Sequence, residues 1–123
     1  MVIVDTSVWI DHLHRADADL VRLLEAGLVR VHPLVEGELA CGTIRDRRAF
    51  LSDLARLDRA ATLTHDEALS LIDRHGLHER GLSIIDVHLL GSALIAGDTI
   101  RTRDRSLRKE AERIGVAWPP RPG

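Results

Sequence analysis

The chain has 123 residues, a formal net charge of −2 and an apolar share of 45%, which suits one folded domain and excludes a mostly disordered chain. Cys41 is the only cysteine, which excludes a disulfide framework and a cysteine-based zinc site and favours a reducing, cytoplasmic setting. No apolar run approaches the roughly 20 residues that span a bilayer, so we expect no membrane segment.

Short apolar runs alternate with longer amphipathic segments along the chain. In chain order, the pattern predicts a strand at 2–4, helices at 7–13 and 18–26, a strand at 29–31, helices at 33–42 and 45–57, a strand at 61–63, helices at 65–75 and 83–96, a strand at 99–101, a helix at 105–114 and an edge strand at 116–117. Thr64 with Glu67, and Ser83 with Asp86, form capping boxes that mark two helix starts.

This alternation predicts an α/β fold in one domain, with a short parallel sheet of four to five strands and helices on both faces. We place the domain at residues 1–117 and a proline-rich tail at residues 118–123. Ligands of such folds gather at the carboxyl ends of the strands. Asp5 follows the first strand and Asp104 follows the strand at 99–101, so we expect both acids at the same edge of the sheet.

Each of these acids also has a purely structural interpretation. Asp5 and Asp104 stand where an N-cap is common, although Thr6 or Ser7 could cap the first helix equally well. Asp86 completes a capping box, yet the helical wheel puts it on an apolar arc, where a carboxylate is costly unless it is paired or binds a metal. For each acid taken alone, the cap and the functional site both remain open.

Two glutamates on the predicted helix at 33–42 are treated differently. Glu36 and Glu38 point about 200° apart, so both cannot face one centre. Glu38 lies on the same apolar face of this helix as Cys41, and we expect Cys41 in the core. Glu38 is therefore the candidate for a buried polar centre, and Glu36 is expected to be a solvated charge. Oxygen ligands without His or Cys select Mg²⁺ or Mn²⁺, so the set of acids makes sense mainly with such a cation.

Four segments of the chain resemble the PIN-domain ribonucleases, specifically the VapC-type toxins of toxin–antitoxin pairs. They are Val-Ile-Val-Asp-Thr-Ser-Val-Trp-Ile-Asp-His from Val2, His-Pro-Leu-Val-Glu-Gly-Glu-Leu-Ala-Cys-Gly from His32, Ile-Asp-Val-His-Leu-Leu-Gly-Ser-Ala-Leu from Ile85, and Thr-Arg-Asp-Arg-Ser-Leu from Thr102. The segments come in the order of the family and span nearly the whole chain.

The resemblance implies a site, a reaction and partners. It assigns catalysis and metal binding to Asp5, Glu38, Asp86 and Asp104, with Thr102 and Ser7 as supporting hydroxyls. It implies one or two Mg²⁺ or Mn²⁺ ions and hydrolysis of RNA phosphodiester bonds by a metal-activated water, with 5′-phosphate and 3′-hydroxyl products. It also implies a homodimer and a cognate VapB-like antitoxin that blocks the acidic site and supplies the DNA contacts when the complex represses its operon.

Two further interpretations stay open at this point. Arg103, Arg105 and Arg108 flank Asp104 and are candidate contacts to the RNA backbone, but a solvated helix face explains them as well. The chain could also be a non-catalytic PIN-like module that binds RNA or a protein without cutting it. The complete set of acids favours the enzyme.

Overall fold

Strands and helices alternate through residues 1–120, the part of the chain that the computed structural model describes. Their order and bounds are β1 (Val2–Val4), α1 (Thr6–His14), α2 (Ala18–Glu25), β2 (Val29–Val31), α3 (Pro33–Cys41), α4 (Arg47–Leu54), β3 (Asp58–Arg59), α5 (His65–His75), α6 (Ile84–Ala96), β4 (Thr99–Arg101) and α7 (Arg105–Arg113). Strands β1, β2 and β4 and both predicted capping boxes are confirmed.

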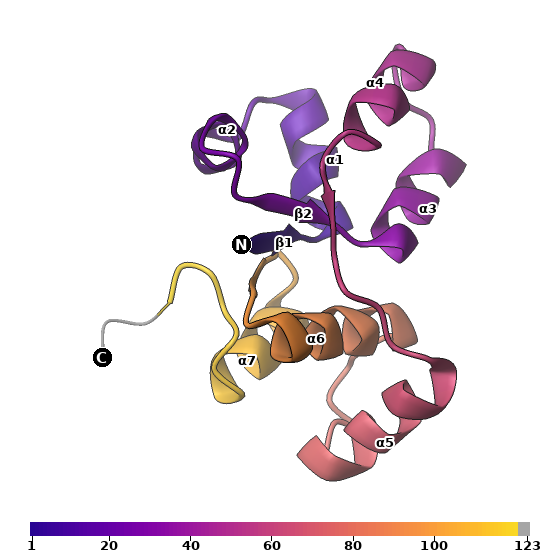
Figure 1. Cartoon of the computed structure of the whole chain (residues 1–123), viewed down its shortest axis with the longest axis vertical. Coiled ribbons are helices and arrows are strands. Elements are labelled where there is room, and N and C mark those ends of the chain that lie inside the picture. Colours follow the sequence, from indigo (N-terminus) through magenta and orange to yellow (C-terminus); the bar gives the residue numbers. More distant parts are fainter. Residues whose placement is uncertain (121–123) are drawn as a thin grey trace.

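The four strands form one parallel sheet in the order β3-β2-β1-β4. Strand β1 lies between β2 and β4, and its Ile3 is in register with Arg30 of β2 and with Ile100 of β4. In Figure 1, helices α1 to α4 lie on one side of the strands and α5 to α7 lie on the other. The predicted α/β fold is therefore confirmed, and the carboxyl ends of neighbouring strands meet at one edge.

The strands and the inner faces of the helices enclose one apolar core. Its fully buried side chains include Ile3, Val8, Leu89, Leu90, Ile100 and Leu107. Close packing of the segment before α5 against α6 depends on Gly91, because an added Cβ there would lie 2.3 Å from Leu63 Cδ1. Within residues 1–120, no helix is long and apolar enough to cross a membrane.

The third strand lies at Asp58–Arg59, so its prediction at 61–63 is wrong. Asp58 and Arg59 are exposed at the edge of the sheet, and they pair in register with Arg30 and Val31. The pairing uses backbone hydrogen bonds only, and both side chains are exposed. The strand therefore has no apolar sequence pattern from which it could be predicted. The predicted strand at 116–117 is reduced to a single bridge between Ile100 and Ala117.

Two helix predictions also need correction. The helix predicted at 45–57 is only Arg47–Leu54, and it starts after Asp46, whose φ of 51° is left-handed rather than helical. Cys41, predicted in the core, is exposed at the last position of α3, while Leu39 takes a buried position of that helix.

The predicted tail begins with a residue that contacts the sheet. Trp118 is partly buried, and its amide donates to the carbonyl of Ile100 at 2.8 Å. Its ring lies 5.0 Å from the guanidinium carbon of Arg101. Residues 121–123 of the predicted tail lie outside the described residues.

Candidate functional site

Four acidic side chains from four parts of the chain line one hollow at the carboxyl edge of the sheet. Asp5 follows β1, Glu38 lies on α3, Asp86 is in the first turn of α6, and Asp104 precedes α7. The hollow has a volume of about 330 Å³, and Ser7 also lines it. The structure thus brings together the four acids that the sequence predicted. As they stand, no three Asp, Glu, His or Cys side chains among residues 1–120 form a group that could hold a metal ion.

Asp5 is both a helix cap and a buried site residue, so the two interpretations left open by the sequence are compatible. Its Oδ1 accepts a 2.8 Å hydrogen bond from the amide of Thr6 at the start of α1. Its Oδ2 accepts from the hydroxyls of Ser7 at 2.9 Å and Thr102 at 2.7 Å. Only 7% of Asp5 is exposed, so these donors fix the orientation of the carboxylate.

The pKa of Asp86 shows how the acids in the hollow affect one another. Burial raises the pKa of Asp86, and the negative charges of Asp5 and Asp104 raise it further, against the lowering effect of the hydrogen bonds from Ser83. The capping box holds the side chain in place, because its Oδ2 accepts from the amide of Ser83 at 3.0 Å. Ionised carboxylates that lie close together repel one another, and a cation between them offsets this repulsion. Carboxylate oxygens are ligands that suit Mg²⁺ or Mn²⁺.

Glu38 lies at the rim of the hollow rather than in the buried centre that the sequence predicted, because its residue is exposed. Its Oε1 accepts a 2.7 Å hydrogen bond from the hydroxyl of Thr6. Glu36 was predicted to be solvated. Its partly exposed carboxylate accepts two hydrogen bonds from Arg59, at 2.8 and 3.2 Å, which tie α3 to the edge strand β3.

Asp104 combines capping with placement in the hollow, as Asp5 does. Its Oδ1 accepts from the amide of Leu107 at 3.0 Å, which caps α7. Its own amide donates to the hydroxyl of Thr102 at 3.0 Å. The predicted supporting residue Thr102 therefore touches Asp5 through its proton and Asp104 through its oxygen. Ser7, the other predicted support, accepts from the amide of Arg103 at 3.1 Å.

The three arginines predicted as RNA contacts differ in their contacts. Arg103 pairs with Asp11 at 2.8 Å and with Asp17 at 2.6 Å. Arg108 pairs with Glu112 at 2.6 Å and donates to the carbonyl groups of Trp118 and Pro119. The side chain of Arg105 is exposed and makes no hydrogen bond or ion pair within the described part of the chain.

Sequence reasoning missed Asp17, which is 6% exposed and precedes α2. Burial would raise its pKa, but hydrogen bonds from the amide of Leu20 and from Arg101 and Arg103 outweigh burial and lower the pKa to about 2. The position of Asp17 before a helix indicates an N-cap. Nothing local in the sequence indicates its two arginine partners.

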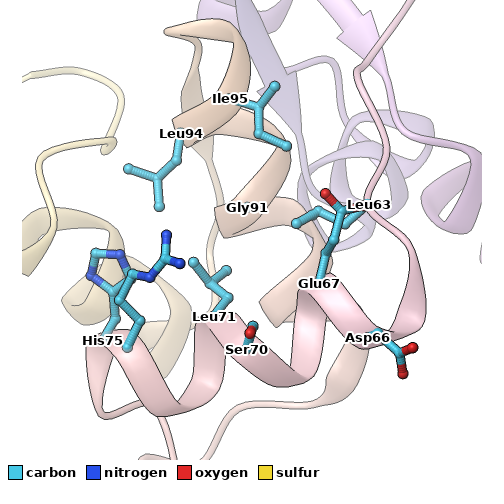
Figure 2. Close-up of a pocket in the computed structure, with 10 residues that line it drawn as sticks. Leu63, Asp66, Glu67, Ser70, Leu71, His75, Gly91, Leu94 and Ile95 are labelled. Atoms are coloured by element: carbon cyan, nitrogen blue, oxygen red, sulfur yellow. The ribbon is translucent and has the colours of Figure 1, made fainter.

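A larger hollow, of about 540 Å³, lies between α5 and α6, away from the four acids. Figure 2 shows Leu63, Leu71, Leu94 and Ile95 around it, with Asp66 and His75 at opposite ends of α5. This surface is mainly apolar, with charged groups at its ends. It has the character of a contact surface more than of a catalytic centre.

Comparison with known proteins shows the family and the fold of the chain. Residues 2–112 match the PIN domain family. Over 118 residues the chain is 48% identical to Ribonuclease VapC32 of Mycobacterium tuberculosis, in the strains CDC 1551 / Oshkosh and ATCC 25618 / H37Rv, with 95% of each protein covered. The crystal structure of PAE2754 from Pyrobaculum aerophilum has a similar fold, with a TM-score of 0.59 at 19% identity over 89% of this chain and 84% of that one.

Proposed function

The chain belongs to the PIN-domain family as a VapC-type ribonuclease, and on that premise we propose that it is a toxin of a toxin–antitoxin pair that cleaves RNA with Mg²⁺ or Mn²⁺. One observation carries the proposal: four acids line a single hollow, and the pKa of Asp86 is raised by burial and by two of its acidic neighbours. Such a cluster is costly for the fold and is explained by a cation that it binds.

The proposed ligands are Asp5, Asp86 and Asp104, with Glu38 completing the shell or orienting water. When bound, a divalent ion lowers the pKa of a water molecule and offsets the charge that develops on phosphate oxygens. Hydrogen bonds within the chain fix these carboxylates. Two hydroxyls donate to Asp5, and Asp86 and Asp104 are each held in a helix cap. The carboxylates are therefore oriented before the ion arrives.

Glu38 is the proposed acceptor for the proton of the attacking water. Thr6 holds its Oε1, and Oε2 accepts no hydrogen bond within residues 1–120. The water attacks phosphorus, the bond to the 3′ oxygen breaks, and that oxygen takes up a proton from solvent. The products are a 3′-hydroxyl and a 5′-phosphate end.

Arg105 is the best placed of the three arginines to contact the RNA backbone. It directly follows Asp104, it is exposed, and no carboxylate among residues 1–120 competes for it. Arg103 and Arg108 are engaged in ion pairs within the protein, so binding RNA would require them to leave those partners. We therefore assign Arg105 to the phosphate next to the cleaved bond.

The proposal also includes partners and a compartment. A cognate VapB-like antitoxin would block the acidic hollow, and DNA would be contacted only through that antitoxin. The toxin would act in the cytoplasm as a homodimer.

The dimer surface in this proposal is the face formed by α5 and α6. Ile95 is 58% exposed there, and it lines the 540 Å³ hollow together with Leu94 and Leu71 (Figure 2). Asp66 lies in the first turn of α5 and Arg74 in its last turn, about 12 Å apart along the axis. Neither forms an ion pair in the described chain. A two-fold axis across the middle of α5 would place Asp66 of one copy against Arg74 of the other, which makes the surface self-complementary.

The proposed activity is tested by incubating the purified chain with total cellular RNA and Mg²⁺ or Mn²⁺, and sequencing the new ends. We expect 5′-phosphate ends that disappear on chelation. Asp5→Asn and Asp104→Asn should each reduce cleavage by roughly 100-fold or more. Loss of a residue that only holds a metal ligand in place typically costs less, about 10–100-fold. Asp73→Asn, which changes an exposed acid of α5, is the matched control and should cleave normally.

Two outcomes would contradict the proposal. RNA that binds without being cut would indicate a non-catalytic module. Cleavage that survives both Asp5→Asn and Asp104→Asn would show that the acidic hollow is not the active site.

A further inference from the structure

Two arginines on either side of Thr102 bind the same buried carboxylate. The guanidinium nitrogens of Arg101 and Arg103 lie 2.7 and 2.6 Å from Oδ2 of Asp17. Between them, Thr102 donates to Asp5 at 2.7 Å. Consecutive side chains of an extended segment point to opposite sides. The segment is therefore held on one side by Asp17 and on the other by the acidic site.

The carboxylate of Asp17 is buried and has several hydrogen-bond donors. Its side chain is 3% exposed, and its Oδ1 accepts from the amide of Leu20 at 2.8 Å, which fixes it at the start of α2. The side chain of Arg101 is 15% exposed and its guanidinium packs on the ring of Trp118. Ion pairs away from solvent are weakly screened and have defined geometry, unlike pairs on the surface.

From these contacts we infer that Asp17 is a positioning residue for the acidic site, acting through Arg101 and Arg103 on Thr102 and Asp104. The inference rests on the proposed metal-dependent function. The path is short: Asp17 holds residues 101 and 103, Thr102 lies between them, and the amide of Asp104 donates to the hydroxyl of Thr102 at 3.0 Å. Asp17 itself lies outside the acidic hollow and touches neither metal nor RNA.

Removing this carboxylate charge would loosen two of the four acids. Arg101 and Arg103 would lose their shared anion. The segment would keep only the longer pair of Arg101 with Asp19, at 3.6 Å, and the pair of Arg103 with Asp11, at 2.8 Å. Thr102 would then donate to Asp5 in fewer of its conformations, and Asp104 would be less well placed. Outer-shell partners of metal ligands affect metal affinity by about 10–100-fold, and an effect through one further residue belongs at the low end.

The chain offers a matched control at the other end of the same strand. Asp98 directly precedes β4, is 4% exposed, and pairs with Arg30 at 3.2 Å and with the amino group of Met1 at 3.5 Å. It is thus a second buried carboxylate with cationic partners, but it lies at the amino edge of the sheet. Asp98→Asn should destabilise the fold as Asp17→Asn does, without moving the acidic site.

The experiment is a Mn²⁺ titration of the purified full chain without RNA, following the electron paramagnetic resonance signal of free Mn²⁺. Thermal unfolding is measured on the same samples. We expect Asp17→Asn to raise the half-saturating Mn²⁺ concentration by about tenfold, and Arg103→Gln, a change at a half-exposed side chain, to raise it less. Asp98→Asn should keep the wild-type value while lowering the Tm.

The outcomes separate this inference from the proposed function. An unchanged Mn²⁺ affinity in folded Asp17→Asn would overturn the positioning role alone. An equal loss of affinity in Asp98→Asn would also overturn it, because general destabilisation would then explain the effect. If Asp17→Asn does not fold, Arg103→Gln decides, since unchanged affinity there is equally contrary. A wild-type chain that binds no Mn²⁺ would overturn the metal site itself and this inference with it.

Discussion

Thr102 donates a hydrogen bond of 2.7 Å from Oγ1 to Oδ2 of Asp5, across 97 positions of sequence. The two residues follow β4 and β1, which are adjacent and parallel, so the ends of both strands meet at this bond. The same hydroxyl oxygen accepts from the amide of Asp104 at 3.0 Å. One small side chain thus connects two of the proposed metal ligands.

Thr102→Val tests this connection, because it keeps the shape of the side chain and removes both hydrogen bonds. A hydrogen bond to a charged group is worth about 1.5–3 kcal/mol, so we expect the free energy of unfolding to fall by about 2 kcal/mol. RNA cleavage should fall by roughly 10-fold or more, as for other outer-shell partners. Thr102→Ser keeps the hydroxyl and should retain most of the activity in the same assay. A fully active Thr102→Val would contradict the assigned role.

The raised pKa of Asp86 predicts that the site costs stability when it holds no ion. Above this pKa the carboxylate is ionised in the fold against burial and against the charges of Asp5 and Asp104. The penalty is absent at low pH, where folded and unfolded chains are both protonated, and it grows as pH rises through the raised pKa.

Asp86→Asn should therefore raise the Tm at pH 7 in the presence of a chelator, since the amide can still accept from Ser83 and carries no charge. The difference from the wild type should vanish near pH 3. Added Mn²⁺ should reverse the order, because only the wild type keeps the full set of ligands. Differential scanning calorimetry in the three conditions checks the prediction, and a lower Tm for Asp86→Asn at pH 7 without metal would contradict it.

His32 predicts a separate dependence on pH. Burial lowers its pKa to about 4, with smaller contributions from His88 and Arg59. Its Nδ1 accepts from the amide of Leu34 and caps α3, which requires the neutral ring. Because the unfolded chain takes up this proton near pH 6.5 and the folded chain only near pH 4, stability is lost as pH falls between these values, by about 3 kcal/mol.

Replacing His32 by asparagine should flatten this part of the stability profile, because asparagine can cap a helix but does not titrate. The free energy of unfolding is measured by urea titration at several pH values between 6.5 and 4, and its slope against pH is compared. The slope is used because the substitution also changes packing, which shifts the free energy equally at all pH values. His78→Asn removes an exposed histidine and should leave the slope unchanged. An equal slope in wild type and His32→Asn would refute the prediction.

The acids of the site were predictable because each one lies at a local landmark. Asp5 directly follows a short apolar run, Asp104 comes shortly after the predicted strand at 99–101, and Asp86 follows a serine by the spacing of a capping box. Parallel strands then bring these landmarks to one edge. The burial of each acid could not be predicted from such local patterns. Glu38 was expected in a buried centre but lies exposed at the rim of the hollow.

The network around Asp17 was hidden for a physical reason. Its arginine partners are 84 and 86 positions away, and an ion pair leaves no periodic pattern in either segment. Arg103 was predicted as a contact to RNA, and its pairs with Asp11 and Asp17 could not be foreseen from the sequence. Charge in a sequence shows where a cation is available but does not show which anion it will meet.

The face of α5 gives the last prediction, which concerns assembly. If two copies pair across a two-fold axis, Arg74→Glu places acid against Asp66 twice. Replacing an attraction by a repulsion of about 1 kcal/mol at each of the two contacts should raise the dimer dissociation constant by roughly tenfold or more. Asp66→Arg should weaken the dimer in the same way. Sedimentation velocity over a range of concentrations measures both.

The double variant Asp66→Arg with Arg74→Glu exchanges the charges and should restore the dimer, because each new glutamate again faces an arginine. Arg56→Glu reverses an exposed charge after α4, away from α5, and should leave the association unchanged. The effect of Arg74→Glu should also shrink at high salt, since exposed charges are screened. A dimer that tolerates both single reversals, or one that the double variant fails to restore, would place the interface on another face of the chain.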